Sequence, residues 1–308
     1  MRIGIDVGGT KIEGIAIGLT GETLFRERIS TPVGDYPGTL KSVAALVRKI
    51  EEQTGQSGTI GVGIPGAISP DTGLVKNANS TCLIGERLDA DLRDILDRDI
   101  RVANDADCFA LSEAIDGAGA DYASVFGVIL GTGVGGGLVI GGTLVQGPNA
   151  ISGEWGHNRL PALTSAGSSS DDGAAPMCYC GRTGCIETYL SGPALSRRHF
   201  DLTGKMRSVE EISDAAETGN TDAQQTLMRY EEDLARGLAM VINIVDPAAI
   251  VLGGGISNLT RLYANIPRLL TPHVFSDTVH TALLPPKYGD SSGVRGAAWL
   301  WPAASGSA

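Results

Sequence analysis

The chain has 308 residues, with 24 lysines and arginines against 35 aspartates and glutamates, and a net charge of −11. This acidity, without a cluster of basic residues, argues against a nucleic-acid-binding surface and against an anionic membrane surface as partner. Its 42% hydrophobic residues can form a large core, which excludes extensive disorder, and its 43 glycines follow no Gly-X-Y period, which excludes a collagen-like chain. The glycines therefore indicate turns and places where backbone approaches a ligand closely.

The first part of the chain alternates strands and helices, which is typical of an α/β domain. Apolar residues predict a strand over 2–7, a glycine turn and a returning strand over 12–17. Asp6 lies where a signal peptide would be apolar, so export is not supported and a cytoplasmic protein is expected. The elements expected next are a helix over 37–54, strands over 59–64 and 100–103, and a helix that follows Asn104-Asp105 and ends near 116.

A second, larger α/β domain is expected over 119–290, after an N-terminal domain over 1–118. Its uncharged run over 125–142 is interrupted by glycines and predicts a β-hairpin, not a membrane span. The other elements expected are helices over 207–217, 221–244 and 257–270, a strand over 249–252, and a C-terminal helix within about 291–302 that returns to the N-terminal domain. Residues 163–176 are expected to be a mobile loop and 303–308 a disordered tail.

Three cysteines within eight residues, Cys178, Cys180 and Cys185, follow His157 in the second domain. Three thiolates and one imidazole provide the four ligands of a tetrahedral Zn²⁺ site, and a closed ligand shell favours a structural role over catalysis. The alternative is a group of reduced core thiols beside an unrelated histidine.

Two glycine turns indicate phosphate binding, because successive backbone N–H groups in such turns can bind an anion. They are Gly8-Gly9-Thr10, which follows Asp6, and Gly131-Thr132-Gly133; the Asp6 carboxylate is suited to Mg²⁺. Ordinary hairpin turns remain the alternative for each. Glycine spacings of the dinucleotide-binding type occur over 61–66 and 131–136, but neither precedes a predicted helix, so a Rossmann oxidoreductase is not favoured.

These motifs occur together in one order along the chain. They are Asp6–Lys11 (DVGGTK), Asn104-Asp105-Ala106, Gly131-Thr132-Gly133, Glu154–His157 (EWGH), Cys178–Glu187 (CYCGRTGCIE) and Gly253-Gly254-Gly255. The set resembles the ROK family of sugar kinases and related repressors, and the match runs from Met1 to about Pro302. The resemblance implies the two-domain, actin-like ATPase (ribonuclease H-like) fold, with ATP and sugar meeting in the cleft between the domains.

The resemblance also implies roles for single residues. Asp105 would be the general base that accepts the proton of the attacking sugar hydroxyl, whereas its position alone favours a helix N-cap. The residues implied to bind sugar are Asn104, Asp105, Glu154, His157 and Glu187, and weaker candidates are Pro65, Gly66 and Asn79. The residues expected to hold the nucleotide and its Mg²⁺ are Asp6, Gly8, Gly9, Thr10, Lys11, Gly131, Thr132, Gly133, Gly254 and Gly255.

Within the family, three segments most resemble bacterial fructokinases (mannofructokinases): 76–81, 178–181 and 289–301. This resemblance implies ATP-dependent phosphorylation of the 6-hydroxyl of fructose, with mannose as a possible second substrate, by a homodimer. A glucokinase or an N-acetylhexosamine kinase is the alternative, because a few loop positions distinguish such sugars. A sugar-sensing repressor is a remote alternative, since it would need a helix-turn-helix domain and the first strand is expected at residue 2.

Overall fold

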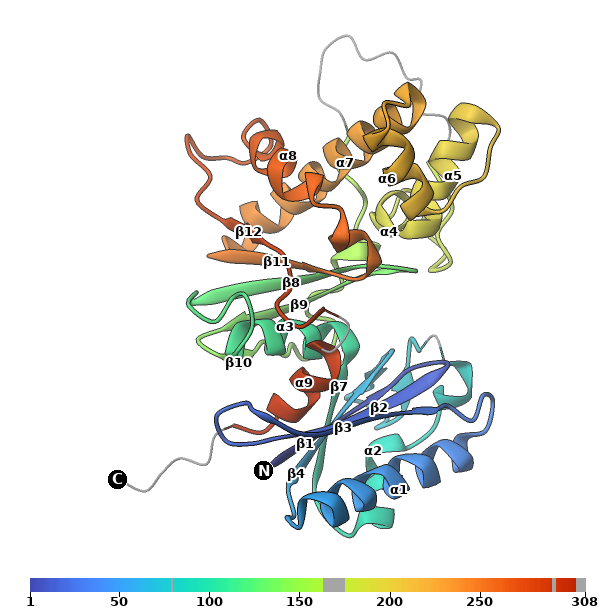
Figure 1. Cartoon of the computed structure of the whole chain (residues 1–308), viewed down its shortest axis with the longest axis vertical. Coiled ribbons are helices and arrows are strands. Elements are labelled where there is room, and N and C mark those ends of the chain that lie inside the picture. The colour runs from blue at the N-terminus through green and yellow to red at the C-terminus, as the bar shows by residue number, and fades with distance from the viewer. Residues whose placement is uncertain (79, 163–174, 290–291, 303–308) are drawn as a thin grey trace. The chain divides into compact units, whose positions relative to one another are not determined.

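The computed structural model describes residues 1–78, 80–162, 175–289 and 292–302, and the chain divides into two compact units (Figure 1). The first unit comprises Met1–Gly127, Gly137–Gly153 and Lys287–Ala308. The second comprises Val128–Gly136 and Glu154–Pro286. The domain boundaries predicted at 118 and 290 stay predictions; the first unit additionally contains residues 137–153. Asn79, most of the predicted mobile loop and the predicted tail lie outside the described residues.

In the first unit, five strands form a sheet in the order β3-β2-β1-β4-β7. These strands are β1 (Arg2–Val7), β2 (Lys11–Ile17), β3 (Thr23–Ser30), β4 (Thr59–Ile64) and β7 (Ile100–Asn104). The β1–β2 and β2–β3 pairs are antiparallel, whereas β1–β4 and β4–β7 are parallel. The short strands β5 (Ala67–Ile68) and β6 (Val75–Lys76) pair with each other. The chain therefore begins with the predicted hairpin and continues into parallel pairing.

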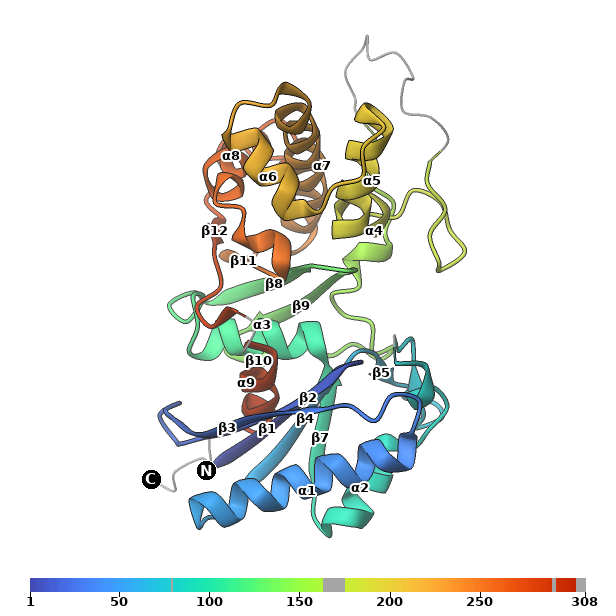
Figure 2. The ribbon, with the colours of Figure 1, turned by 45° about the vertical axis from the view of Figure 1, so that its right-hand side comes forward.

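Helices pack on both faces of this sheet (Figure 2). The helices of the unit are α1 (Tyr36–Thr54), η1 (Thr81–Leu83), α2 (Leu88–Leu96), α3 (Asp105–Ile115) and α9 (Ser292–Trp299). Apolar residues of α1 and α2 share a core cluster with β1 and β4, while α9 packs on the other face. A Cβ on Gly4 would lie 2.1 Å from the Val294 carbonyl oxygen, and one on Gly61 1.8 Å from that of Ala297. Because glycine has no Cβ, the backbone of α9 can lie directly against β1 and β4.

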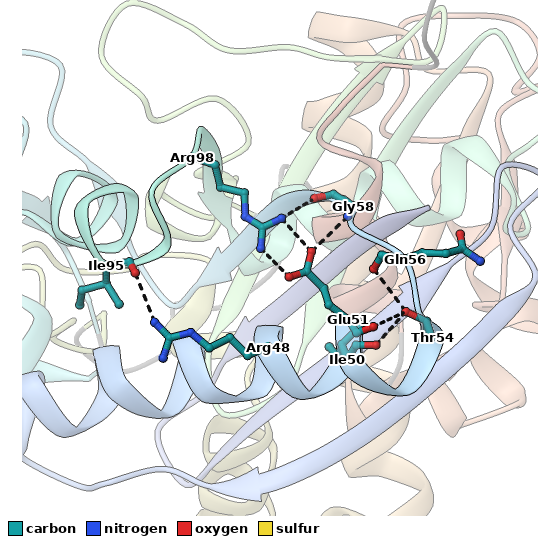
Figure 3. Close-up of polar contacts among 8 residues, drawn as sticks. All are labelled: Arg48, Ile50, Glu51, Thr54, Gln56, Gly58, Ile95 and Arg98. Carbon is teal, nitrogen blue, oxygen red and sulfur yellow. Dashed lines mark hydrogen bonds and ion pairs between the residues drawn. The ribbon is translucent and has the colours of Figure 1, made fainter.

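The end of α1 is connected to β4 and α2 by polar contacts (Figure 3). Nη1 and Nη2 of Arg98 each donate to the carboxylate of Glu51 at 2.7 Å. Glu51 also accepts from the Gly58 backbone N–H at 3.3 Å, just before β4 begins. An Arg–carboxylate pair with two parallel hydrogen bonds fixes geometry as well as charge. It therefore helps to hold the entry into the parallel strands that carry the predicted site.

The second unit contains the remaining helices, which lie on one side of a five-stranded sheet of order β10-β9-β8-β11-β12 in both views (Figures 1 and 2). The strands are β8 (Ser124–Leu130), β9 (Val134–Ile140), β10 (Thr143–Leu144), β11 (Ala249–Gly253) and β12 (Ala282–Leu284). The division between the units falls within β8 and β9, and β10 belongs to the first unit. The helices are η2 (Trp155–His157), α4 (Glu187–Leu190), α5 (Gly192–Thr203), α6 (Val209–Glu217), α7 (Thr221–Val245), η3 (Gly255–Asn258) and α8 (Arg261–Leu270).

The predicted α/β character and the glycine hairpin are confirmed, while several element limits differ. The helix expected over 257–270 is the short η3 followed by α8, which begins only at Arg261. The strand β3 and the helices α2 and α5 were not predicted from the sequence. Among the described helices, none combines the length and apolar composition needed to cross a membrane.

Candidate functional site

Asp6 lies near the end of β1, half-buried, where the parallel register brings it beside Gly63 of β4. Loss of hydration raises the pKa of its carboxyl to about 7, and the charges of Asp105 and Glu13 add to this rise. Desolvation and a nearby like charge both disfavour the ionised form of a carboxyl group. A cation bound beside Asp6 would oppose these effects, so this carboxyl fits the predicted magnesium ligand.

The turn after β1 exposes Gly9, Thr10 and Lys11. It is held by a bond from the Gly8 N–H to the Lys11 carbonyl at 3.0 Å. Thr31, at the end of β3, donates its hydroxyl to the Gly8 carbonyl at 2.8 Å. Gly8 and Gly9 line a cavity of about 200 Å³. The exposed, anchored backbone of this turn is suited to the predicted phosphate contact.

Asn104 and Asp105 lie where β7 ends and α3 begins. Asn104 is the N-cap residue: its side-chain oxygen accepts from the Ala106 N–H at 2.8 Å. Asp105 is the first helical residue, and its Oδ1 also accepts from the Ala106 N–H at 2.8 Å. The Asn104 amide donates to the Gly66 carbonyl at 3.2 Å, which joins two of the predicted sugar-binding segments. The helix cap expected for Asp105 from its position is thus mainly provided by Asn104.

Gly66 and its neighbour Pro65 follow β4 in the same unit. A Cβ on Gly66 would lie 2.8 Å from the Lys76 carbonyl oxygen and 2.9 Å from the Cβ of Ala78. The segment that leads to position 79 therefore packs directly on Gly66. Asn79 itself lies outside the described residues, so its predicted contact with sugar stays a prediction.

In the second unit, the turn between β8 and β9 lies beside Glu187. The Gly131 N–H donates to the Gly133 carbonyl at 3.0 Å, and Thr132 is exposed. Glu187, the first residue of α4, accepts from the Val134 N–H at 2.9 Å through its Oε2. A residue predicted to bind sugar therefore lies directly against a turn predicted to bind phosphate. This placement agrees with a site in which the two ligands meet.

Gly254 and Gly255 follow β11 in this unit. Gly254 has φ +80°, and a Cβ there would lie 2.4 Å from the Leu130 carbonyl oxygen. A side chain would therefore be both strained and in collision with β8. The space beside Gly255 is open, since no described atom lies within 4 Å of a Cβ built there. This open backbone is compatible with the predicted approach to the adenosine.

The four predicted zinc ligands come together: one ligand atom from each of His157, Cys178, Cys180 and Cys185 lies within 4.8 Å of all the others. Isolated bridges pair Met177 with Thr183 and Arg159 with Cys185, which folds the segment back on itself. The pKa of Cys180 is lowered to about 6 by hydrogen bonds from Arg182, whereas burial raises that of Cys185 to about 12. Three thiols and one imidazole within this distance fit the donor set of a structural zinc site.

Tyr179 belongs to this cluster but was not predicted as a site residue. Its hydroxyl lies 3.0 Å from Nε2 of His157, and the two rings meet edge to face at 84°. Nδ1 of His157 faces the Cys178 sulfur at 3.6 Å. Nε2 of His157, a residue predicted to bind sugar, therefore has the Tyr179 hydroxyl as its partner. Burial and the charges of Glu187 and Glu154 raise the pKa of Tyr179 to about 12. The sequence indicated Tyr179 only through its position between the predicted metal ligands Cys178 and Cys180.

The predicted site residues thus form one group in each unit. The first unit holds Asp6, Gly8, Gly9, Thr10, Lys11, Pro65, Gly66, Asn104 and Asp105. The second holds Gly131, Thr132, Gly133, Glu154, His157, Cys178, Cys180, Cys185, Glu187, Gly254 and Gly255. Glu154 is exposed and directly precedes η2, which contains His157. The glycine turns among them follow β1, β8 and β11, and Asn104 ends β7, as expected for ligand sites of α/β proteins. Glu154, the metal-type cluster of His157, Cys178, Cys180 and Cys185, and Glu187 do not directly follow a named strand.

This architecture, with two mixed α/β sheets and a glycine turn between β1 and β2 and between β8 and β9, is the actin-like ATPase fold. The ROK family model matches residues 2–304, and the chain belongs to the ROK family. The fold class and the family expected from the motifs are therefore confirmed.

Three similar proteins illustrate the likeness. The N-acetyl-D-glucosamine kinase of Vibrio cholerae is 41% identical over 304 residues, which cover 97% of this chain and 99% of the relative. The ROK hexokinase of Thermus thermophilus superposes with a TM-score of 0.85 at 26% identity, covering 97% of both chains. The ROK glucokinase of Streptomyces griseus, solved with glucose and AMPPNP, has a TM-score of 0.76 at 28% identity, covering 96% of this chain and 97% of that one.

The fructokinase subtype is not confirmed, since the Vibrio relative corresponds to the N-acetylhexosamine alternative.

The raised pKa of Asp6 predicts a pH-dependent effect on stability. Between the ordinary value of 3.8 and about 7, the folded protein keeps a proton that the unfolded chain has lost. The free energy of unfolding should therefore fall as pH rises through this interval, because the folded state binds more protons. Asp6→Asn removes the ionisable group, so without divalent cations its Tm relative to the wild type should be higher at pH 8 than at pH 5.

The matched control for this measurement is Asp71→Asn, because Asp71 is exposed. This control should show the same Tm difference from the wild type at both pH values. An Asp6→Asn difference that is equal at pH 5 and pH 8 would contradict the raised pKa.

Proposed function

We propose that this chain is an ATP-dependent sugar kinase that phosphorylates the 6-hydroxyl of N-acetyl-D-glucosamine. The observation that carries the proposal is the 41% identity, over nearly the whole of both chains, to a relative named as an N-acetyl-D-glucosamine kinase. The Streptomyces glucokinase solved with glucose and AMPPNP supports an ATP-type nucleotide as the second substrate. Fructose, the substrate expected from the sequence, becomes the alternative.

Asp105 is proposed to orient the 6-hydroxyl and accept its proton. The parallel pairing of β4 and β7, together with the Asn104–Gly66 bond, fixes the start of α3 on which Asp105 lies. Phosphoryl transfer requires little covalent chemistry from a protein, so rate acceleration depends mainly on positioning the hydroxyl and stabilising phosphoryl charge. Asn104, Glu154 and Glu187 are proposed to bind the sugar hydroxyls, with Pro65, Gly66 and Asn79 alongside.

The nucleotide is proposed to lie on glycine turns of both units. The residues for this role are Gly8, Gly9, Thr10, Lys11, Gly131, Thr132, Gly133, Gly254 and Gly255, with Asp6 as a ligand of Mg²⁺. A bound Mg²⁺ would neutralise charge on the phosphate oxygens. The half-buried Asp6 carboxyl, with its raised pKa, is the acidic group that fits such an ion.

A zinc ion is proposed to hold the loop around Cys178 through His157, Cys178, Cys180 and Cys185. Its role would be structural, because four protein ligands leave no position for substrate. The ion would fix His157, and the Tyr179 hydroxyl at its Nε2 would then lie between the zinc loop and the sugar. The homodimer implied by the family resemblance stays a prediction.

The substrate is tested by comparing sugars in an assay that couples ADP release to a spectroscopic signal. N-Acetylglucosamine should give the highest kcat/KM, at least about tenfold above fructose, glucose, mannose and N-acetylmannosamine. A value for fructose above that for N-acetylglucosamine would restore the fructokinase assignment. Absence of turnover with every sugar would contradict a kinase of this class.

Asp105→Asn tests the proposed base. The variant should keep its fold and its Kd for N-acetylglucosamine, because the cap at Ala106 is made chiefly by Asn104. Its kcat should fall at least about 100-fold, as expected when a general base is removed. Calorimetric binding of the sugar and single-turnover kinetics measure the two quantities. A variant that turns over within a few fold of the wild type would exclude Asp105 as the base.

Zinc content is tested by elemental analysis of the purified protein. The wild type should contain about one zinc per chain, and Cys180→Ser should contain much less, because one of four ligands is lost. The variant should also have a Tm lowered by at least about 5 °C. Cys82→Ser, which changes a cysteine outside the cluster, is the matched control and should keep its zinc. A metal-free wild type of unchanged Tm would refute the site.

A further inference from the structure

The second unit has a cavity that contains none of the residues predicted to bind sugar, nucleotide or metal. It has a volume of about 300 Å³ and lies among α4, α5 and α7. Its lining includes Arg197 and Arg198 of α5 and Arg229 of α7, while Asp201 is the only acidic residue among the described lining residues. Three arginines therefore line one cavity.

Among the described residues, few acidic groups lie beside these arginines. Arg198 pairs with Asp233, but Asp233 also pairs with Arg236. Nη1 of Arg198 is buried and has no hydrogen-bond partner within the described structure. Arg229 forms no ion pair with any described residue. Three arginines and one aspartate thus line the cavity, and the one carboxylate that pairs with Arg198 is shared with Arg236. The described lining therefore has a local positive excess in a chain whose net charge is −11.

An anion is the ligand that such a surface recognises. The planar guanidinium group matches the oxygen geometry of phosphate and donates two hydrogen bonds to it at once. Pro176, Ala194 and Leu202 add an apolar wall, which suits the carbon skeleton of an organic molecule. A volume at the lower end of the range for ligand sites indicates a small compound. The acidity of the whole chain disfavours an extended polyanion such as a nucleic acid.

We propose that this cavity binds a phosphate monoester of sugar-phosphate size through Arg197, Arg198 and Arg229. The bound phosphate would give Nη1 of Arg198 the acceptor that it lacks among the described residues. The exposed Arg229 would add a second charge-assisted hydrogen bond. No bond forms or breaks in this step. The site is distinct in its residues from the proposed kinase site.

The cavity is also linked to α4. Nη2 of Arg197 donates to the Thr188 carbonyl at 2.7 Å, and Thr188 directly follows Glu187. A phosphate that accepts from Nη2 of Arg197 would compete with this carbonyl, so binding in this geometry would weaken a contact that holds α4. Sugar affinity then falls when the cavity is filled, and by linkage the sugar weakens phosphate binding equally. This second step rests on the proposed function, whereas the binding itself does not.

Binding is tested by isothermal calorimetry of the full chain, with inorganic phosphate and N-acetylglucosamine 6-phosphate as probes. N-Acetylglucosamine and ADP are kept near saturation, so that neither probe is measured at the kinase site. Both probes should bind saturably, and Arg229→Gln should raise the Kd at least about tenfold. Arg268→Gln, an exposed arginine of α8 outside the cavity, is the matched control and should bind as the wild type.

The two probes distinguish the source of the phosphate. Tighter binding of the sugar phosphate assigns the cavity to an organic phosphate ester, and equal affinities assign it to free phosphate. Absence of saturable binding by both, or an unchanged Kd in Arg229→Gln, overturns the proposal. Because the heat of binding is measured without turnover, this result is independent of whether the chain proves to be a kinase.

The link to α4 is tested by the KM for the sugar with and without inorganic phosphate, at concentrations around its measured Kd. KM should rise with phosphate in the wild type and in Arg268→Gln, and should not respond in Arg197→Gln. An unchanged wild-type KM under saturating phosphate would refute the link to α4 and leave the calorimetric result as it stands.

Discussion

The electrostatic environment of Asp6 is the constraint around which the first unit is arranged. β1, β4 and β7 are parallel, so their carboxyl ends lie at one edge of the sheet and bring acidic and amide side chains together there. At this edge, loss of hydration and the nearby charge of Asp105 raise the pKa of the Asp6 carboxyl to about 7. A carboxyl in this state is poorly stabilised by the protein alone. It is well suited to an edge where a cation and a phosphate are expected to meet.

Helix α9 packs closely on one face of the sheet that carries this edge. Helix α9 returns from the far end of the sequence and packs against Gly4 and Gly61, where any side chain would collide with its carbonyl oxygens. The glycine content that dominates the composition therefore has two different uses. Some glycines bring helix and sheet backbones into contact, and others, such as Gly254 with φ +80°, shape the turns next to the predicted ligands.

The sequence predicted the elements whose apolar residues are buried on a regular period. Helix α1 and strand β4 agree with their predicted limits to within one residue, because their buried positions repeat at helical or strand spacing. Strand β3 was missed because it is an exposed edge strand with three charged residues, so its pattern carries little hydrophobic signal. The nine-residue helix α2 buries only Leu88 and Leu92, so its sequence also carries little periodic hydrophobic signal.

The motifs in the sequence predicted more of the candidate site residues than of the contacts between them. The metal-type cluster could be expected because cysteine and histidine spacing is constrained by ligand geometry. The contact of Tyr179 with His157 could not, because any residue type can stand between two ligands and only the fold shows where its side chain points. The choice between fructose and an N-acetylhexosamine could not be made from the motifs for a similar reason. A few loop side chains distinguish the substituents of a hexose.

Helix α4 shows how these parts depend on one another. It has only four residues, too short for stability on its own, so its position is determined by its contacts. Cys185 precedes it, the Glu187 carboxylate at its start accepts from the Val134 N–H, and the Thr188 carbonyl accepts from Arg197. A change at the metal-type cluster, the β8–β9 turn or the arginine-lined cavity must therefore act on the same few atoms. Glu187, which is proposed to bind the sugar, lies at the start of the helix that these contacts hold.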